Sequence, residues 1–270
     1  MGMIPVTKAH AYGNDFLYVR ADTVQQDLAP ALAVRLCNRH RGVGADGLIL
    51  YTLTPGGATM TLLNADGGAA ELSGNGLRAL AALVVRAREQ AGGSIDPTVE
   101  VGTSAGPRRL RFEGREGSRY LFVAEMGAPL KMEQRTLSAA GETLRIVVLS
   151  IGNPQVVVLG PLPDDERFAR LGPAIEKHEA FAHGTNVEFA EVEATDRVRI
   201  RIWERGVGPT ESSGTGSCAA AVAAAAYGGA SRVLDVAAPG GTQRVSWTDR
   251  GVELTGWAEI LFDGTFLAPI

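Results

Sequence analysis

Residues 211–218 read ESSGTGSC, and the chain continues as CAAAVAAAAY over residues 218–227. The alanine-rich stretch predicts a helix, because alanine has the highest helix propensity. Serine is favoured at the position that caps a helix N-terminus, so we expect Ser213 to begin this helix. Glycines at positions 214 and 216 would let a ligand approach the backbone N–H groups of the first turn. The stretch therefore predicts a capped helix start that could also face a ligand.

A second copy of this stretch lies earlier in the chain, at residues 73–83, which read SGNGLRALAAL. The likeness extends upstream at nearly the same offset, since an alternating apolar run ends at Asn64 before the first turn and at Glu204 before the second. Two further matching pairs are Gly13-Asn14 with Gly152-Asn153, and Gly44-Ala45-Asp46 with Gly184-Thr185-Asn186. The repeat is too long for a solenoid unit. We therefore predict two similar domains related by a pseudo-twofold axis, with a cleft between them.

The composition is that of a globular protein with little overall charge. Hydrophobic residues make up 45% of the chain, and 26 basic residues are set against 30 acidic ones, for a net charge of -4. This balance provides no field that would attract nucleic acid or an anionic membrane, so neither is expected as a partner. The small-residue run 219–230 is shorter than the ~20 residues that span a bilayer. Cys37 and Cys218 predict neither a disulfide framework nor a metal site, and together with an N-terminus unlike a signal peptide they favour the cytoplasm.

The two serine–glycine turns suggest a chemistry when they are considered together, although a plain helix cap is the simpler interpretation of either one alone. A helix N-terminus has unpaired N–H groups and roughly half a positive charge, which favours a carboxylate ligand. If both turns hold the carboxylate of one amino acid, Ser73 and Ser213 would flank its Cα. Groups on opposite faces of one carbon suit removal of a proton on one side and its return on the other. Such a reaction requires no cofactor, because the N–H groups stabilise the developing charge.

Several segments resemble those of the diaminopimelate epimerase family, one of the cofactor-independent amino-acid racemases and epimerases. They are TKAHAYGNDF, LCNRHRGVGADGLIL, LLNADG, SGNG, IGNPQVVV, HGTNVEF, IRIWERGVGPT and SGTGSCAAA, and they span nearly the whole length. The resemblance implies an α+β fold of two pseudosymmetric domains, each a mixed β-barrel around a central α-helix. The last strand would return to the first domain, which places the domains at residues 1–118 plus 262–270 and at residues 119–261.

The resemblance also implies a set of site residues. The two catalytic positions are those of Ser73 and Ser213. The residues that would bind the α-carboxylate are Gly74, Asn75, Gly214 and Thr215. The residues that would hold the rest of the substrate are Asn14, Asn64, Asn153, Asn186, Glu204 and Arg205. The implied activity is an isomerase of lysine and cell-wall biosynthesis that interconverts LL- and meso-2,6-diaminopimelate without a cofactor and acts as a homodimer.

The chain departs from the family pattern where the chemistry would occur. Each family turn begins with a cysteine, whereas this chain has Ser73 and Ser213, and Gln155 stands where the family usually has histidine. A thiol, with a pKa of about 8.5, is readily tuned to act as base and acid, whereas a serine hydroxyl normally needs an adjacent base. Three interpretations stay open: an epimerase that uses serines, a dehydratase of a hydroxylated amino acid, and an impaired amino-acid-binding homologue or Cys-to-Ser variant.

Overall fold

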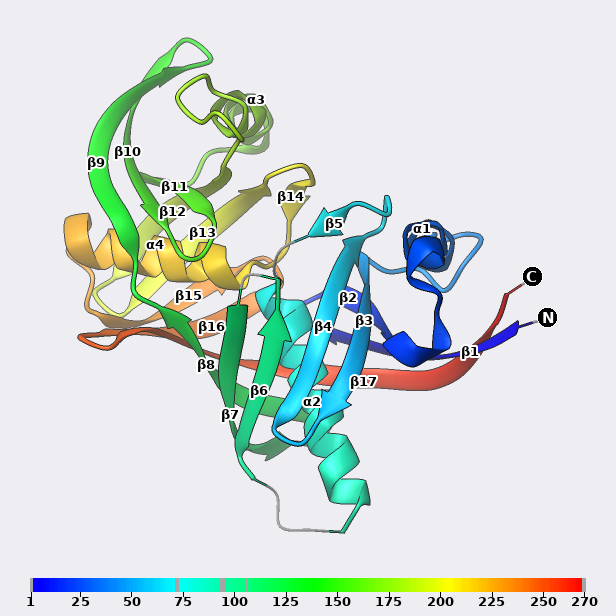
Figure 1. Cartoon of the computed structure of the whole chain (residues 1–270). Coiled ribbons are helices and arrows are strands. Elements are labelled where there is room, and N and C mark those ends of the chain that lie inside the picture. The colour runs from blue at the N-terminus through cyan, green and yellow to red at the C-terminus, as the bar shows by residue number, and fades with distance from the viewer. Residues whose placement is uncertain (1, 71–72, 93–95, 105, 269–270) are drawn as a thin grey trace. The chain divides into compact units, whose positions relative to one another are not determined.

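The computed structural model describes residues 2–70, 73–92, 96–104 and 106–268 (Figure 1). The chain forms two compact units, which are Met1–Ala124 with Gly256–Ile270, and Glu125–Thr255. The first unit is thus built from both ends of the chain, and the second from its middle.

Of the domain boundaries expected from the sequence, 118/119 lies directly before strand β8 (Arg119–Gly127) and 261/262 lies inside strand β17 (Gly251–Ala268). Residues Arg119 to Ala124 of β8 pair with the strand before it, and residues from Glu259 onward in β17 pair with the first strand of the chain. Strand pairing therefore assigns the beginning of β8 and the end of β17 to the first unit.

The strands of the first unit pair in a ring. Their order around the ring is β1–β2–β3–β4–β6–β7–β8–β17, and β17 pairs with β1 again. The pairs β2–β3 and β4–β6 are parallel, so the barrel is mixed. The strands not yet given bounds are β1 (Gly2–Ala11), β2 (Asn14–Arg20), β3 (Gly47–Thr54), β4 (Gly57–Asn64), β6 (Thr98–Thr103) and β7 (Gly106–Glu116). Helix α2 (Gly74–Gln90) packs against β1, β2, β4, β6 and β7, so it is the central helix of this barrel.

The second unit repeats this order of paired neighbours, with β9 in the place that β17 has in the first unit and β17 in the place of β8. The order is β9–β10–β11–β12–β13–β15–β16–β17, and the parallel pairs, β11–β12 and β13–β15, correspond to β2–β3 and β4–β6. The strands are β9 (Leu130–Ala139), β10 (Glu142–Ser150), β11 (Pro154–Leu159), β12 (Asn186–Ala194), β13 (Arg197–Glu204), β15 (Val233–Ala238) and β16 (Gly241–Thr248). Helix α4 (Gly214–Tyr227) packs against β10, β11, β12, β13, β15 and β16. The predicted fold class, α+β with two similar mixed barrels around central helices, is confirmed.

A crossover helix joins the strands of the equivalent parallel pair in each unit, because parallel neighbours cannot be joined by a tight turn. Helix α1 (Ala29–Cys37) connects β2 to β3, and helix α3 (Asp165–Glu176) connects β11 to β12. Each buries an apolar face, which for α3 includes Phe168, Leu171 and Ile175. The remaining short elements are η1 (Ala21–Thr23), η2 (Gln26–Leu28), β5 (Ala69–Ala70) and β14 (Gly208–Thr210).

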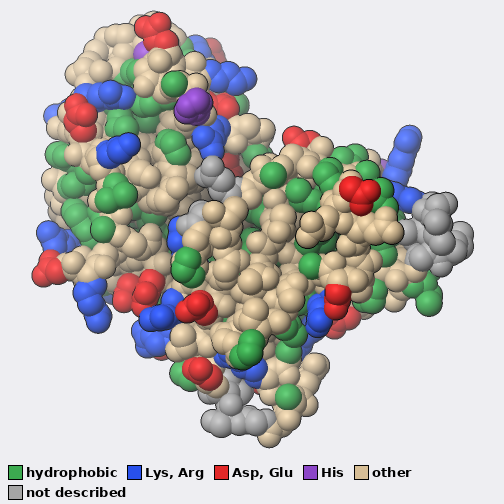
Figure 2. Space-filling model, viewed as in Figure 1, with side chains coloured by type: hydrophobic (Ala, Val, Ile, Leu, Met, Phe, Trp, Pro, Cys, Tyr) green, Lys and Arg blue, Asp and Glu red, His purple; other side chains and the backbone are tan. Residues whose placement is uncertain are grey.

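Charged side chains of both signs are interspersed on the face that Figure 2 shows, in keeping with the small net charge of -4. In the part of the chain that the structure describes, no helix has both the length and the apolar character needed to cross a membrane.

Candidate active site

Ser73 and Ser213 occupy the same position in the two units, directly before α2 and α4. Both have extended backbone angles, φ −125° and ψ 119° at Ser73 and φ −140° and ψ 125° at Ser213. Each hydroxyl oxygen accepts a hydrogen bond from the backbone N–H three residues later, Gly76 or Gly216, at 3.1 Å in both units. Both serines therefore cap their helices. The same N–H bond also favours negative charge on the serine oxygen.

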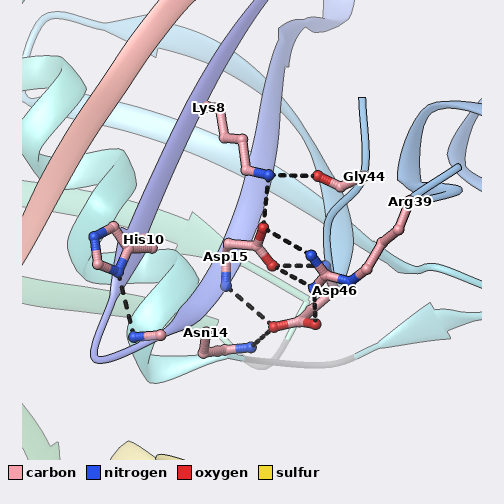
Figure 3. Close-up of polar contacts among 8 residues, drawn as sticks. Lys8, His10, Asn14, Asp15, Arg39, Gly44 and Asp46 are labelled. Atoms are coloured by element: carbon pink, nitrogen blue, oxygen red, sulfur yellow. Dashed lines mark hydrogen bonds and ion pairs between the residues drawn. The ribbon is translucent and has the colours of Figure 1, made fainter. Parts of the chain in front are cut away.

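In the first unit, the structure brings Asn14 and Asn75 together at the start of α2. The Asn75 side-chain amide donates to Asn14 Oδ1 at 3.3 Å. The Asn14 amide donates to Asp46 Oδ2 at 2.7 Å, as Figure 3 shows. Asn75 is buried, with 2% of its surface exposed. Asp46 thus fixes the amide of Asn14, and Asn14 in turn fixes Asn75.

Asp46 belongs to a cluster of ion pairs that joins β1, β2 and the loop after α1 (Figure 3). Arg39 Nη2 lies 2.8 Å from Asp46 Oδ1 and 2.8 Å from Asp15 Oδ1, and Lys8 Nζ lies 2.8 Å from Asp15 Oδ2. Burial works to raise the pKa of Asp15, but hydrogen bonds from Arg39 and Lys8 outweigh burial and hold that pKa below its usual value. The lowered pKa keeps Asp15 ionised at neutral pH, and the cluster anchors Asp46 behind Asn14.

The second unit pairs its equivalent residues with the direction of the hydrogen bond reversed. The Asn153 amide donates to Thr215 Oγ1 at 3.4 Å, whereas in the first unit the helix residue Asn75 donates to Asn14. Thr215 Oγ1 lies 3.5 Å from Ser213 Oγ, and either hydroxyl can donate. Asn153, Thr215 and Ser213 thus form one connected polar group at the start of α4.

Asn186 and Arg205 are also neighbours. Asn186 Oδ1 accepts from the backbone N–H of Arg205 at 2.9 Å, and the Asn186 amide donates to the carbonyl of Pro154 at 3.2 Å. The guanidinium of Arg205 donates to the carbonyl of His183 at 3.2 Å. Asn186 therefore holds the turn that follows Glu204, the last residue of β13.

In the first unit, the exposed Asn64 ends β4 at the equivalent place.

Gln155 lies between Asn153 and Glu188, a carboxyl group on β12 with 0% of its surface exposed. One atom of the Gln155 amide lies 2.9 and 3.2 Å from the two oxygens of Glu188. The other lies 2.7 Å from Asn153 Oδ1 and 3.1 Å from Thr215 Oγ1. Burial, with a smaller contribution from Glu204, raises the pKa of Glu188 well above its usual value and so favours the protonated, uncharged form of this carboxyl group.

Neither cysteine supplies a thiolate to the serine turns. Cys37 is 2% exposed, and burial together with Asp15 and Asp46 raises its pKa to about 12. Cys218 is fully buried inside α4, in the apolar core of the second unit. Among the described residues, no cluster of three or more His, Cys, Asp and Glu side chains could hold a metal ion.

Two supporting carboxylates were not predicted from the sequence. Asp46 lay inside a repeated segment and could have been found there, because its counterpart Asn186 was predicted as a site residue. Glu188 lies in the strand sequence NVEFAE, where an acidic residue next to valine and phenylalanine is normally taken for the solvent face of an alternating strand. Strand β12 is instead buried on both faces from Asn186 to Ala190, and the sequence alone does not reveal this.

Comparisons with known proteins agree over nearly the whole chain. The family model described as diaminopimelate epimerase matches residues 6–132 and 147–261. A diaminopimelate epimerase of Desulforudis audaxviator is 39% identical over 282 residues, covering 97% of this chain and 98% of the relative. One of Microcystis aeruginosa is 37% identical over 285 residues, covering 97% and 99%.

Solved structures share the fold at low sequence identity. A predicted epimerase from Pseudomonas aeruginosa aligns with a TM-score of 0.74 at 17% identity, over 98% of this chain and 100% of that one. A hydroxyproline epimerase from Agrobacterium vitis with bound trans-4-hydroxy-L-proline aligns with a TM-score of 0.71 at 15% identity, over 98% and 91%. These similarities concern the fold alone.

Proposed function

Because the chain belongs to the diaminopimelate epimerase family, and is accordingly an isomerase, we propose that it interconverts LL- and meso-2,6-diaminopimelate at Cα. The observation that carries this proposal is the pair of serine-capped helix starts with the same geometry, each bordered by a hydrogen-bonded pair of polar residues. A single capped helix would be ordinary, whereas two equivalent ones supply two proton-transfer groups of the same kind.

The proposed reaction begins with the α-carboxylate of the substrate at the two helix starts. Gly74 and Asn75 in one unit and Gly214 and Thr215 in the other would bind it through the first turns of α2 and α4, where N–H groups favour an anion. Asn14, Asn64, Asn153, Asn186, Glu204 and Arg205 would hold the remainder of the substrate. The guanidinium of Arg205 suits a distal carboxylate, since it presents paired donors.

One serine, as the alkoxide that remains after its hydroxyl proton is released to solvent, then accepts the Cα proton, and the other serine hydroxyl delivers its proton to the opposite face of the same carbon. The C–H bond that breaks leaves its electron pair on Cα and the carboxylate, and the new C–H bond uses that pair. The N–H bonds from Gly76 and Gly216, 3.1 Å from the serine oxygens, support the oxygen that carries negative charge. The serine that delivers the proton in one direction of the reaction accepts it in the reverse direction.

A serine hydroxyl is a much weaker acid than a thiol and is rarely ionised to act as the base, so we expect slow exchange in this chain and faster exchange in Ser73→Cys with Ser213→Cys. The test is incubation of the protein with LL- and with meso-diaminopimelate in deuterated water, followed by proton NMR at Cα and by separation of the stereoisomers. The expected result is deuterium incorporation with interconversion, reduced at least about 100-fold by Ser73→Ala or by Ser213→Ala.

The control is Asp164→Ala, which removes the cap of α3, where the Asp164 side chain accepts from Arg167 N–H, without touching either serine turn. It shows how much activity is lost through destabilisation alone. No exchange in the natural chain or in the double cysteine variant would contradict the proposal. Binding without exchange would identify an amino-acid-binding homologue, and release of an α-keto product from a hydroxyproline would identify a dehydratase.

The same family membership leads us to propose a homodimer in the cytoplasm that acts in lysine and cell-wall biosynthesis. Sedimentation equilibrium tests the assembly, since a single species at the 28.3 kDa mass of one chain would contradict it.

A further inference from the structure

Glu188 and Ser213 share a small space beside the first turn of α4. A Cβ on Gly216 would lie 2.6 Å from Glu188 Oε1 and 3.1 Å from Ser213 Oγ, so only a glycine leaves room for both groups there. Glu188 reaches this position from β12, with none of its surface exposed. A carboxyl group that is costly to bury therefore lies next to a proposed catalytic hydroxyl.

The amide of Gln155 connects Glu188 to the rest of this group, and its two orientations require different protonation states of Glu188. If the amide oxygen faces Glu188, at 2.9 Å, the contact is a hydrogen bond only when Glu188 carries a proton to donate. The amide nitrogen then donates to Asn153 Oδ1 at 2.7 Å. If the amide nitrogen faces Glu188, it donates to both oxygens of the carboxylate, at 2.9 and 3.2 Å, as an ionised Glu188 requires.

The orientation of Gln155 decides where the Thr215 hydroxyl proton goes. With Glu188 protonated, Thr215 Oγ1 accepts from the Asn153 amide at 3.4 Å, and its own proton can be donated to Ser213 Oγ at 3.5 Å. With Glu188 ionised, the Gln155 oxygen lies 3.1 Å from Thr215 Oγ1 and takes that proton instead. The Asn153 amide must then turn, so that its nitrogen faces the Gln155 oxygen. A hydrogen bond from Thr215 to Ser213 is available in the first state and is lost in the second.

We propose that Glu188 is a positioning residue for Ser213, whose proton sets the orientation of the Gln155 amide and thereby determines whether Thr215 donates to Ser213. The effect on activity rests on the proposed function, because it assumes that Ser213 transfers the Cα proton. The hydrogen bond from Thr215 stabilises a negatively charged Ser213 oxygen, so the protonated state of Glu188 is the active one.

The surroundings of Glu188 favour that active state. Burial opposes its ionisation, Glu204 on the neighbouring strand β13 adds to the effect, and the N-terminal end of α4 acts in the opposite direction. The first two prevail, so the pKa of Glu188 is raised, which favours the state in which Thr215 can donate to Ser213. Exchange activity is then lost at alkaline pH as Glu188 ionises.

The experiment is a pH titration of the Gln155 side-chain amide by ¹⁵N NMR in the full chain without substrate. The expected result is a step in the amide shifts at the pH where Glu188 ionises, and no such step in Glu188→Gln, whose side-chain N–H mimics the protonated acid. The matched control is Glu191→Gln on the same strand, which makes the same charge change outside this group and should retain the step.

A Gln155 amide that does not shift over the accessible pH range, or that shifts identically in Glu188→Gln, overturns the proposal. In Cα–H exchange, Glu188→Gln should lose the alkaline decline of kcat with little change in KM, and Glu191→Gln should keep it. The two proposals fail separately. A pH-dependent step in the Gln155 amide shifts without any Cα–H exchange contradicts the proposed function alone. Cα–H exchange without such a step contradicts the role of Glu188 alone.

Discussion

Gly76 and Gly216 occupy equivalent positions, three residues after each serine, yet their surroundings differ. A Cβ on Gly216 would lie 2.6 Å from the carboxyl oxygen of Glu188, which is held by Gln155. A Cβ on Gly76 would lie 2.8 Å from Ile49 Cδ1, the free end of a flexible side chain. The repeat therefore preserves the glycine for different reasons in the two units.

Gly216→Ala should consequently destabilise the protein by about 1–3 kcal/mol, because the extra methyl displaces Glu188. Gly76→Ala should stay within about 1 kcal/mol of the natural chain, because Ile49 can move and alanine favours the helix. Urea unfolding of both variants measures the difference. Equal losses of stability would contradict the distinction between the two positions.

The serine turns could be found from the sequence because Ser73 and Ser213 recur in the two halves directly before a predicted helix. Asn14 and Asn153 recur in the same way, whereas the other asparagines were expected from the family resemblance. Glu188 could not, since the alternation rule assumes a strand with one solvent face, and β12 is buried on both. The hydrogen-bonded partners of Asn14 and Asn153 likewise depend on side-chain contacts that no spacing in the sequence specifies.

At the level of elements, α2 and α4 fill similar barrels with different side chains. Residues 214–224 of α4 are all buried, and most are alanine or glycine, so the strands of the second unit close tightly around the helix backbone. Helix α2 buries Leu77, Leu80 and Leu83 in its barrel instead. A large side chain is therefore tolerated in α2 and excluded from the first three turns of α4.

Ala223→Leu, at a fully buried position of α4, should destabilise the protein by about 1–3 kcal/mol through overpacking. Ala226→Leu, at an exposed position of the same helix, should change stability by no more than about 0.5 kcal/mol. Thermal unfolding followed by circular dichroism compares the two. A neutral Ala223→Leu would show that the barrel of the second unit can expand.

The central helices and the strand ends could be predicted because the repeated turns mark them. The crossover helices α1 and α3 carry no shared motif, although they occupy equivalent places between parallel strands. Their sequences, APALAVRLC and DERFARLGPAIE, match different outer surfaces of the barrels. The need for a crossover helix at each place becomes evident only from the parallel pairing of β2 with β3 and of β11 with β12.

For the whole molecule, Glu188 makes stability depend on pH in an unusual direction. Its folded-state pKa lies well above the ordinary 4.5, so between those two values the folded chain holds a proton that the unfolded chain releases. Stability therefore falls as pH rises through that window, by about 1.4 kcal/mol per pH unit for one proton. Asp15 and Asp263, whose pKa values are lowered, act oppositely and lose their contribution only in acid.

Glu188→Gln should remove the fall in stability with rising pH, while the loss of stability in acid should remain. Urea unfolding of both proteins at a series of pH values gives the difference in slope, and the shared contributions of Asp15 and Asp263 cancel in that comparison. Parallel stability curves across neutral and alkaline pH would mean that Glu188 is already ionised in the folded protein.

The pairing of β17 with β1 has a consequence for biosynthesis. The ribosome delivers residues 125–255 before the segment that completes the ring containing β1, so the middle of the chain can fold while the earlier part still waits for its last strand. During that interval, β1 presents an unpaired edge, which is a site for mispairing with other nascent chains. Chaperone engagement should therefore be greatest late in translation, and premature release before residue 256 should leave an aggregation-prone product whose middle portion is nevertheless folded.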